Sequence, residues 1–273
     1  MSADNRPVAV VTGGSAGLGL VIAKTLLCNG FRVVIVGRDA GRLESAVMML
    51  GGPEHEGVLF QVCDLTQRSE VEGLIAFVSQ SVGRLDVLVN CVGASDRGLI
   101  ENLEVKHLEN LWHQNVVTAL LCSQFALPLL EASSGTIVNI GSLASKVGAR
   151  YIGGYSTAKH ALAGMTQQMR LELKPRGIHV ALVSPGPIAR TDAGERYRES
   201  IDSTLPPQAS APGGGTRVKG LQPERVAAAV MRCINRRAVD VVLPGHLRIL
   251  IALGHAFPRL GDWLLLRFTS SKG

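Results

Sequence analysis

The sequence predicts a single α/β domain built on a doubly wound, seven-stranded parallel sheet flanked by helices, and three observations support this. Hydrophobic residues make up 46% of the 273 positions, which is enough for a well-buried core. Only 18% of residues are charged, and the 31 glycines suit short strands and tight turns better than a helical bundle. Short apolar, β-branched runs alternate with amphipathic stretches, which is typical of parallel strands covered on both faces.

Seven apolar runs are expected as strands, with helices between them. They span 7–12, 32–37, 57–64, 85–90, 135–140, 178–184 and 238–245. No internal repeat or linker divides the chain, so 7–245 is expected to form one Rossmann-like core within a single domain, 1–273. The region 190–220 is rich in Pro, Gly and Ser and predicts a substrate loop or lid, and 246–273 predicts an amphipathic extension.

The charge and cysteine content narrow the class of protein. A formal net charge of +6 suits an ordinary basic enzyme or one with an anionic cofactor, and no basic tract interleaved with aromatic residues favours nucleic acid. The cysteines stand singly and are expected as small buried residues in a reducing compartment. They are Cys28, Cys63, Cys91, Cys122 and Cys233. We expect a cytoplasmic protein, because no signal peptide precedes the first strand and no apolar run approaches about 20 residues.

A glycine-rich turn follows the first expected strand. It runs from Gly13 to Gly19, and a helical pattern continues to about Cys28, where Asn29 and Gly30 end it. Glycines at such a junction let the backbone approach a phosphate, and the helix N-terminus offers N–H groups and positive dipole to the anion. With a strand before and a helix after it, the turn predicts a dinucleotide site, rather than glycines that merely pack the helix on the strand.

Three polar residues form a candidate reaction centre. Tyr155 and Lys159 lie four positions apart, so on a helix they share a face, and a nearby ammonium lowers the pKa of a phenol. Ser142 follows the strand run 135–140, at the carboxyl edge where open α/β sheets bind ligands. Each residue has an ordinary alternative, as a packed ring, a solvated lysine or a turn serine. Taken singly these ordinary alternatives are preferred, although Tyr155 can supply a proton and Ser142 can bind a substrate oxygen.

These motifs resemble the short-chain dehydrogenase/reductase family, whose main branch carries Thr-Gly-x-x-x-Gly-x-Gly at the first turn and Tyr-x-x-x-Lys later. The resemblance extends from Val8 to about Pro244 and includes the runs 86–93 and 183–188. One stretch departs from the pattern: family members usually have Asn-Asn-Ala-Gly where this chain has Asn90-Cys91-Val92-Gly93, with Asn90 and Gly93 kept.

The resemblance assigns roles to individual residues. Tyr155 would be the general acid/base, Lys159 would lower its pKa and hold the nicotinamide ribose, and Ser142 would orient the carbonyl. Asn115, in a helix, would hold a water beside the lysine. The residues expected at the cofactor are Thr12, Gly13, Ser15, Gly17, Leu18, Gly19, Arg38, Asp64, Leu65, Asn90, Gly93, Tyr155, Lys159, Pro185, Gly186 and Ile188.

The residue after the second strand favours NADP(H) over NAD(H). An acidic side chain there would bind a ribose diol, whereas a basic one accepts a 2′-phosphate. Here Arg38 occupies the position, with help expected from Ser15 of the glycine turn. Asp39 lies beyond the usual acidic site, and we interpret it as a turn or helix-cap residue.

The resulting hypothesis is an NADP(H)-dependent oxidoreductase that interconverts a ketone or aldehyde and an alcohol, with a nucleotide-sensing, non-catalytic protein as the alternative. Its partners would be a small-molecule substrate and further copies of itself, in a homodimer or homotetramer. Tyr151 is expected to line the substrate pocket, whereas His113, His160 and His179 are not expected to bind metal. The tail 247–268 predicts two amphipathic pieces divided at Pro258, which pack on the body or a symmetry mate, or contact a membrane surface. Such a tail favours a lipophilic substrate.

Overall fold

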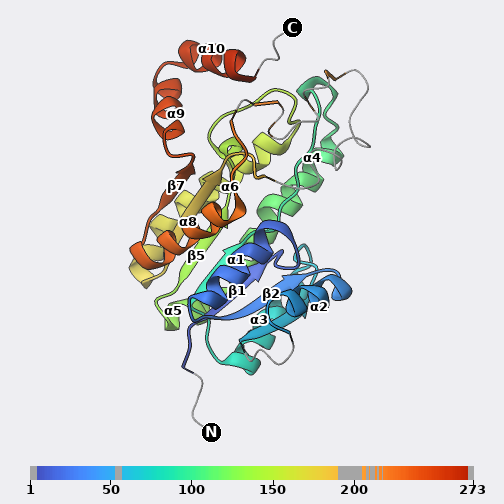
Figure 1. Ribbon diagram of the computed structural model, residues 1–273, viewed down its shortest axis with the longest axis vertical. Helices are drawn as coiled ribbons and strands as arrows, with labels where there is room; N and C mark the ends of the chain where they lie inside the picture. Colours follow the sequence, from blue (N-terminus) through green and yellow to red (C-terminus); the bar gives the residue numbers. More distant parts are fainter. Residues whose placement is uncertain are drawn as a thin grey trace.

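The computed structural model describes residues 5–52, 57–189, 205–206, 209, 213, 215–216 and 218–269. Seven parallel strands form one sheet, in the order β3-β2-β1-β4-β5-β6-β7, with helices on both faces (Figure 1). The predicted α/β fold is therefore confirmed. The strands are β1 Val8–Thr12, β2 Arg32–Gly37, β3 Val58–Val62, β4 Val87–Asn90, β5 Thr136–Ile140, β6 His179–Pro185 and β7 Asp240–Leu243.

The helices fall between the strands as the pattern predicts. The longer ones are α1 Gly17–Cys28, α2 Ala40–Met49, α3 Arg68–Val82, α4 Val105–Trp112, α5 Thr118–Ala132, α6 Tyr155–Leu173, α8 Pro223–Arg236, α9 Leu247–Ala256 and α10 Pro258–Thr269. The short ones are η1 Ile100–Asn102, η2 His113–Val117, η3 Leu143–Ser145 and η4 Lys174–Arg176. The glycine turn leads into α1, which ends at Cys28 as expected.

The sheet separates two apolar cores because successive strand residues point to opposite faces. In β1, Ala9 and Val11 join the core that packs against α1, α2 and α8, while Val8 and Val10 join the core against α3, α5 and α6. All four side chains are buried. This is why the strand runs are continuously apolar instead of alternating.

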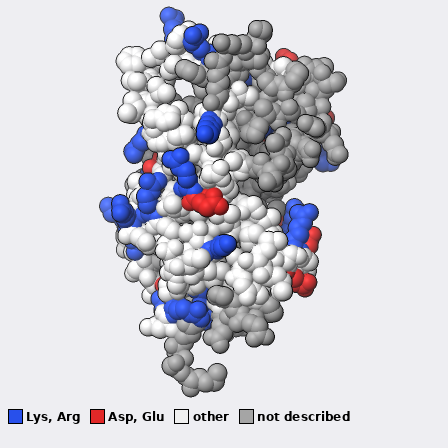
Figure 2. Space-filling model, viewed as in Figure 1, with Lys and Arg blue, Asp and Glu red and all other residues white. Residues whose placement is uncertain are grey.

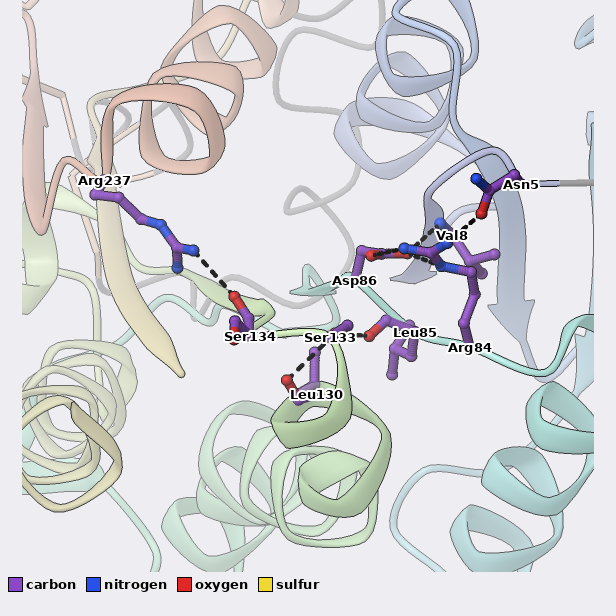
Figure 3. Close-up of polar contacts among 9 residues, drawn as sticks. All are labelled: Asn5, Val8, Arg84, Leu85, Asp86, Leu130, Ser133, Ser134 and Arg237. Carbon is purple, nitrogen blue, oxygen red and sulfur yellow. Dashed lines mark hydrogen bonds and ion pairs between the residues drawn. The ribbon is translucent and has the colours of Figure 1, made fainter. Parts of the chain in front are cut away.

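Strands β1 to β3 are added in one direction across the sheet and β4 to β7 in the other, so the strand order reverses between β1 and β4. A ligand crevice is expected at the carboxyl ends of these two strands. The opposite, amino-terminal edge is fastened by polar contacts (Figure 3). Arg84 binds Asp86 through Nη2 at 2.7 Å, and Asp86 accepts a bond from the Val8 N–H at 2.7 Å. Nearby, the Ser133 hydroxyl donates to the Leu85 carbonyl at 2.6 Å. These contacts connect segments at the amino-terminal edge, whereas the candidate site residues lie at the carboxyl edge.

Some sequence predictions need correction. The third strand ends at Val62 and the seventh spans Asp240–Leu243, so both are shorter than the apolar runs 57–64 and 238–245. After β3 the apolar run continues into the buried Cys63, whereas after β7 it continues into a half-buried Pro244 and an exposed Gly245. Cys28 is exposed, not buried, since it ends α1 on the side away from the sheet core.

The tail forms two helices, α9 and α10, divided at Pro258 as predicted, which stand together at one end of the molecule (Figure 1). We call this pair the hairpin. Among the described residues, one continuous helix, Val105–Ala132, is long and apolar enough to span a membrane, but 44% of its most apolar window is buried in this fold. Most of the predicted lid 190–220 lies outside the described residues.

Candidate active site

The glycine turn has no room for a side chain at Gly14 or Gly19. A Cβ at Gly19 would lie 2.1 Å from the Gly13 carbonyl oxygen, and Gly13 itself has φ +68°. The residue before α1, Ala16, makes no side-chain cap, and the first turn of this helix has no acidic residue. Its N–H groups and dipole are thus available to an anion, which is what a pyrophosphate needs. The residues present suit a dinucleotide.

Two of the predicted cofactor residues, Thr12 and Asn90, make buried hydrogen bonds at the ends of β1 and β4. The Thr12 hydroxyl accepts bonds from the N–H groups of Cys91 (2.9 Å) and Val92 (3.2 Å), tying the end of β1 to the turn after β4. The Asn90 amide nitrogen donates to Asn139 Oδ1 at 2.8 Å and to Ser123 Oγ at 3.2 Å. Both side chains are buried, so they shape the crevice from inside the protein.

The end of β2 presents Arg38 to solvent, next to the turn carrying the half-buried Ser15. Asp39 is a helix cap, as expected: its Oδ1 accepts the Arg42 N–H at 3.0 Å at the start of α2. Its carboxylate is therefore engaged by α2. Asp64, after β3, accepts bonds from the Thr66 N–H and hydroxyl. These bonds, the backbone one first, together with the charge of Arg38, lower the pKa of Asp64.

Most of the remaining predicted residues line one large cavity of about 1530 Å³ at the carboxyl edge. Tyr155, Lys159 and Ser142 line this cavity, although 17 positions of sequence separate the outermost two. The cofactor side contributes Leu18 and Gly93, and the strand β6 side contributes Pro185, Gly186 and Ile188. Leu65 lies instead in the apolar core, so only its backbone could reach an adenine.

Lys159 is buried, with 4% of its surface exposed. Its Nζ donates to the Ile140 carbonyl at 3.0 Å and lies 5.8 Å from the centre of the Tyr155 ring. Burial lowers the pKa of Lys159 to about 8. The neighbouring Cys91 thiol has its own pKa raised to about 12 by burial, so it adds no negative charge at neutral pH. The ammonium therefore faces the tyrosine without a carboxylate partner among the bonds described.

Ser142 caps the short helix η3. Its Oγ accepts the Ala144 N–H at 3.2 Å, while its own N–H donates to Ser145 Oγ at 3.0 Å. This capping box fixes the serine at the end of β5. Because the Oγ accepts in this bond, its hydrogen is available for an oxygen in the cavity.

Asn115 lies in a π-helical turn, His113–Val117, between α4 and α5. Such turns are frequent at functional sites. The side-chain amide donates to the carbonyls of Leu111 (2.8 Å) and Ala94 (2.9 Å), whereas the buried Oδ1 has no hydrogen-bond partner. A Cβ at Gly93 would lie 2.7 Å from this oxygen and 3.1 Å from Lys159 Nζ. The glycine thus keeps open the space between the asparagine and the lysine.

Asp96 lies beside Tyr155, and sequence reasoning did not identify it. Its carboxylate accepts the N–H groups of Gly154 (3.1 Å), the residue before α6, and Tyr155 (3.2 Å), its first residue, and contacts His107 Nε2 at 3.1 Å. An anion at a helix N-terminus is stabilising. One signal was available, because neither Gly153 nor Gly154 supplies a capping side chain for the helix that begins at Tyr155.

We expect Asp96→Asn to lower the unfolding free energy by about 1–2 kcal/mol and to reduce kcat severalfold, because it weakens the cap that positions Tyr155. Urea unfolding and steady-state kinetics measure the two effects. Asp39→Asn weakens a cap on α2 instead and should leave kcat at saturating coenzyme unchanged. An unaltered kcat in Asp96→Asn, with stability lost, would show that this cap is only structural.

Two further expectations concern aromatic and histidine residues. Tyr151 is wrongly predicted: it has φ +66°, its ring lies beneath the Arg150 guanidinium at 5.2 Å, and the cavity is lined by its neighbour Ile152 instead. His160 does line the cavity, and its Nδ1 lies 2.8 Å from the Ser156 carbonyl oxygen. Across the described ranges, no group of three His, Cys, Asp or Glu residues is arranged to hold a metal.

A strand-edge cavity with these residues defines a class of α/β oxidoreductase, and comparisons identify the family. The short chain dehydrogenase family model matches residues 7–202. The 2-(S)-hydroxypropyl-CoM dehydrogenase 3 of Xanthobacter autotrophicus is 34% identical over 199 residues, covering 72% of this chain and 77% of the relative. Ketoacyl reductase HetN of Nostoc sp. is 29% identical over 264 residues, covering 93% and 86%.

A solved structure agrees with these relatives. The crystal structure of a substituted actinorhodin polyketide ketoreductase with NADPH is similar to this chain with a TM-score of 0.78 and 28% identity, covering 90% of this chain and 99% of that one. The protein belongs to the short-chain dehydrogenase/reductase family, an oxidoreductase family whose members interconvert carbonyl compounds and alcohols.

Proposed function

We propose that this protein is an NADP(H)-dependent reductase that interconverts a lipophilic ketone or aldehyde and its alcohol. The observation that carries the proposal is the convergence of Tyr155, Lys159 and Ser142 on one cavity, with the lysine buried beside the tyrosine ring. A buried ammonium favours the phenolate of a neighbouring tyrosine, which makes proton exchange possible near neutral pH.

In the proposed mechanism, the glycine turn and Arg38 would hold NADPH, which would supply the hydride that the carbonyl carbon accepts. The Ser142 hydroxyl donates a hydrogen bond to the carbonyl oxygen and orients it. Tyr155 Oη gives its proton to that oxygen as negative charge develops there, and in the oxidative direction the phenolate takes the proton back. Lys159 stabilises the phenolate between these events, and its remaining donors would hold the nicotinamide ribose.

The phenolate must then regain a proton, and Asn115 supports a route for it. A water that donates to the buried Asn115 Oδ1 would satisfy that unpaired acceptor and lie near Lys159 Nζ, in the space that Gly93 leaves open. Such a water would connect Lys159 with solvent. In this role Asn115 positions the relay and does not touch the substrate.

The proposed preference for NADP(H) rests on Arg38, and its removal supplies a prediction. We expect Arg38→Ala to raise the KM for NADPH about 10- to 100-fold, as loss of a charged hydrogen bond to a phosphate would, and to leave the KM for NADH unchanged. Arg42→Ala is the matched control, because Arg42 is exposed on α2 and pairs with Asp39. Equal effects of Arg38→Ala on both coenzymes would contradict the assignment.

The overall proposal is tested by following NADPH oxidation in the presence of short-chain and lipophilic ketones in parallel. Consumption that depends on the ketone supports it. If NADPH binds but no ketone is reduced, the alternative of a nucleotide-sensing protein gains support. The hydrogen bonds of Asp96 to the start of α6 and the open space at Gly93 favour an enzyme over a nucleotide-sensing protein, because a sensor requires neither feature. The expected homo-oligomer and peripheral membrane contact stay predictions.

A further inference from the structure

The cavity at Tyr155 extends beneath the C-terminal hairpin, beyond the part that a nicotinamide would fill. Its volume of about 1530 Å³ exceeds the roughly 300–1,000 Å³ of pockets that enclose drug-sized ligands. A nicotinamide and a small ketone would therefore occupy only part of it. The remaining volume lies between the Ser142 turn and the hairpin, because both line the same cavity.

The hairpin lines this space mainly with aliphatic side chains. The aliphatic residues are Leu247, Leu250 and Ile251 from α9 and Leu264 and Leu265 from α10, and Gly254, His255, Pro258, Gly261 and Asp262 line the cavity beside them. Ile251, Leu264 and Leu265 are half-buried, and within the described hairpin no side chain is fully buried. Covering this partly exposed apolar surface with an apolar ligand removes it from water and therefore favours binding.

The hairpin is held in place over the catalytic serine. His255 donates through Nε2 to the Lys146 carbonyl at 2.6 Å, directly after η3, and Lys146 Nζ pairs with Asp240 at 2.6 Å. The two helices cross at Gly254 and Gly261, where a Cβ on Gly261 would lie 2.9 Å from the Gly254 Cα. This close approach makes the inner side of α9 and α10 one continuous wall.

The hairpin also has an outer side, with different residues. Ile249 is 68% exposed and Leu266 50% exposed, and neither lines the cavity. In Figure 2 the corresponding region, at the upper left, is largely white with Lys and Arg at its margin. Inner and outer residues of the same chemistry can therefore be compared directly.

We propose that the inner side of the hairpin is a subsite for a hydrocarbon portion of the substrate, so that the substrate is a ketone or aldehyde whose apolar part extends from Ser142 and Tyr155 toward Ile251 and Leu264. This inference rests on the proposed function for the carbonyl end. It adds where the rest of the substrate lies and which residues select its length.

The test is a homologous series of methyl ketones, from 2-butanone to 2-decanone, assayed with NADPH. We expect kcat/KM to rise about two- to fourfold for each added methylene, the upper figure corresponding to complete burial. Ile251→Trp and Leu264→Trp fill the subsite and should lower kcat/KM for 2-decanone at least about tenfold while changing that for 2-butanone less than about twofold. Ile249→Trp and Leu266→Trp are the matched controls on the outer side.

A binding measurement separates this inference from the proposed chemistry. NADP⁺ and 2-decanone cannot react with each other, so calorimetric titration of the ketone into the NADP⁺-loaded protein reports binding alone. Binding that is tighter than for 2-butanone and is lost in the two inner variants supports the subsite, even if no turnover occurs. Absence of chain-length dependence in the parent, or equal effects of inner and outer variants, would overturn it. Thermal melts identify any variant that fails to fold.

Discussion

Tyr155→Phe is expected to reduce kcat by about 10²- to 10⁴-fold, the range that a positioned general acid contributes. The substitution removes only the hydroxyl, so the ring keeps its place at the start of α6 and beside Lys159 Nζ. Coenzyme affinity should change by no more than about tenfold, because the glycine turn and Arg38 are untouched, and loss of one hydrogen bond costs about 0.5–1.5 kcal/mol. Single-turnover kinetics and NADPH titration measure the two quantities.

Tyr151→Phe is the matched control for that experiment. It makes the same chemical change four residues earlier, in a residue that does not line the cavity. Its kcat should equal that of the parent. Comparable losses in both variants would mean that Tyr155 has no special role as an acid, and residual activity above about 10% in Tyr155→Phe would point to another proton donor.

Lys159→Met should separate activity from stability. We expect kcat to fall by at least about 100-fold, because the phenol of Tyr155 loses the cation that favours its ionised form. At neutral pH the variant should nevertheless be more stable. Burial lowers the pKa of Lys159 to about 8, which corresponds to roughly 3 kcal/mol of unfavourable free energy relative to the ordinary value. Loss of the bond to the Ile140 carbonyl offsets about 1 kcal/mol of the gain.

The stability gain depends on pH in a definite direction. The pKa of Lys159 in the folded state, about 8, lies below its ordinary value of 10.5, so between these values the unfolded chain binds more protons. The unfolding free energy of the parent therefore rises with pH across this window, and the advantage of Lys159→Met is largest below pH 8 and disappears toward pH 10.5. Urea unfolding of both proteins at pH 7, 9 and 10.5 measures the difference.

Lys24→Met provides the control for this pH series. Lys24 is exposed on α1, far from the cavity lining, and surface substitutions usually change stability by less than about 0.5 kcal/mol. Its difference from the parent should stay flat with pH. If the Lys159→Met difference is also flat, the ammonium is not desolvated in the folded protein, and the argument for its effect on Tyr155 weakens.

Much of the fold could be predicted because its signals are local. Each strand of the sheet is an apolar, β-branched run. The glycine turn needs glycine for two local reasons, a φ of +68° at Gly13 and a lack of space for a Cβ at Gly19. Strand ends were less predictable. Cys63 is apolar and 1% exposed, more buried than Val62 at the end of the strand, so composition alone does not mark the end at Val62.

The candidate site could be predicted only where its residues belong to one helix or one turn. Tyr155 and Lys159 share a helical face, which spacing reveals. Asp96 could not be paired with α6 in this way, because 58 positions separate it from Gly154 and the contact exists only when the turn after β4 lies against the start of that helix. The prediction that Tyr151 lines the pocket was wrong because its left-handed backbone conformation places its ring beside Arg150.

By itself, the sequence determined the parallel α/β fold, the nucleotide turn and the tyrosine–lysine pair, because each depends on neighbours within a few residues. The tertiary structure decided how buried Lys159 is, what caps α6, and that the hairpin shares a cavity with Ser142. Those properties depend on which distant segments exclude water from one another. Burial and its effect on pKa arise only when the chain has folded around a group.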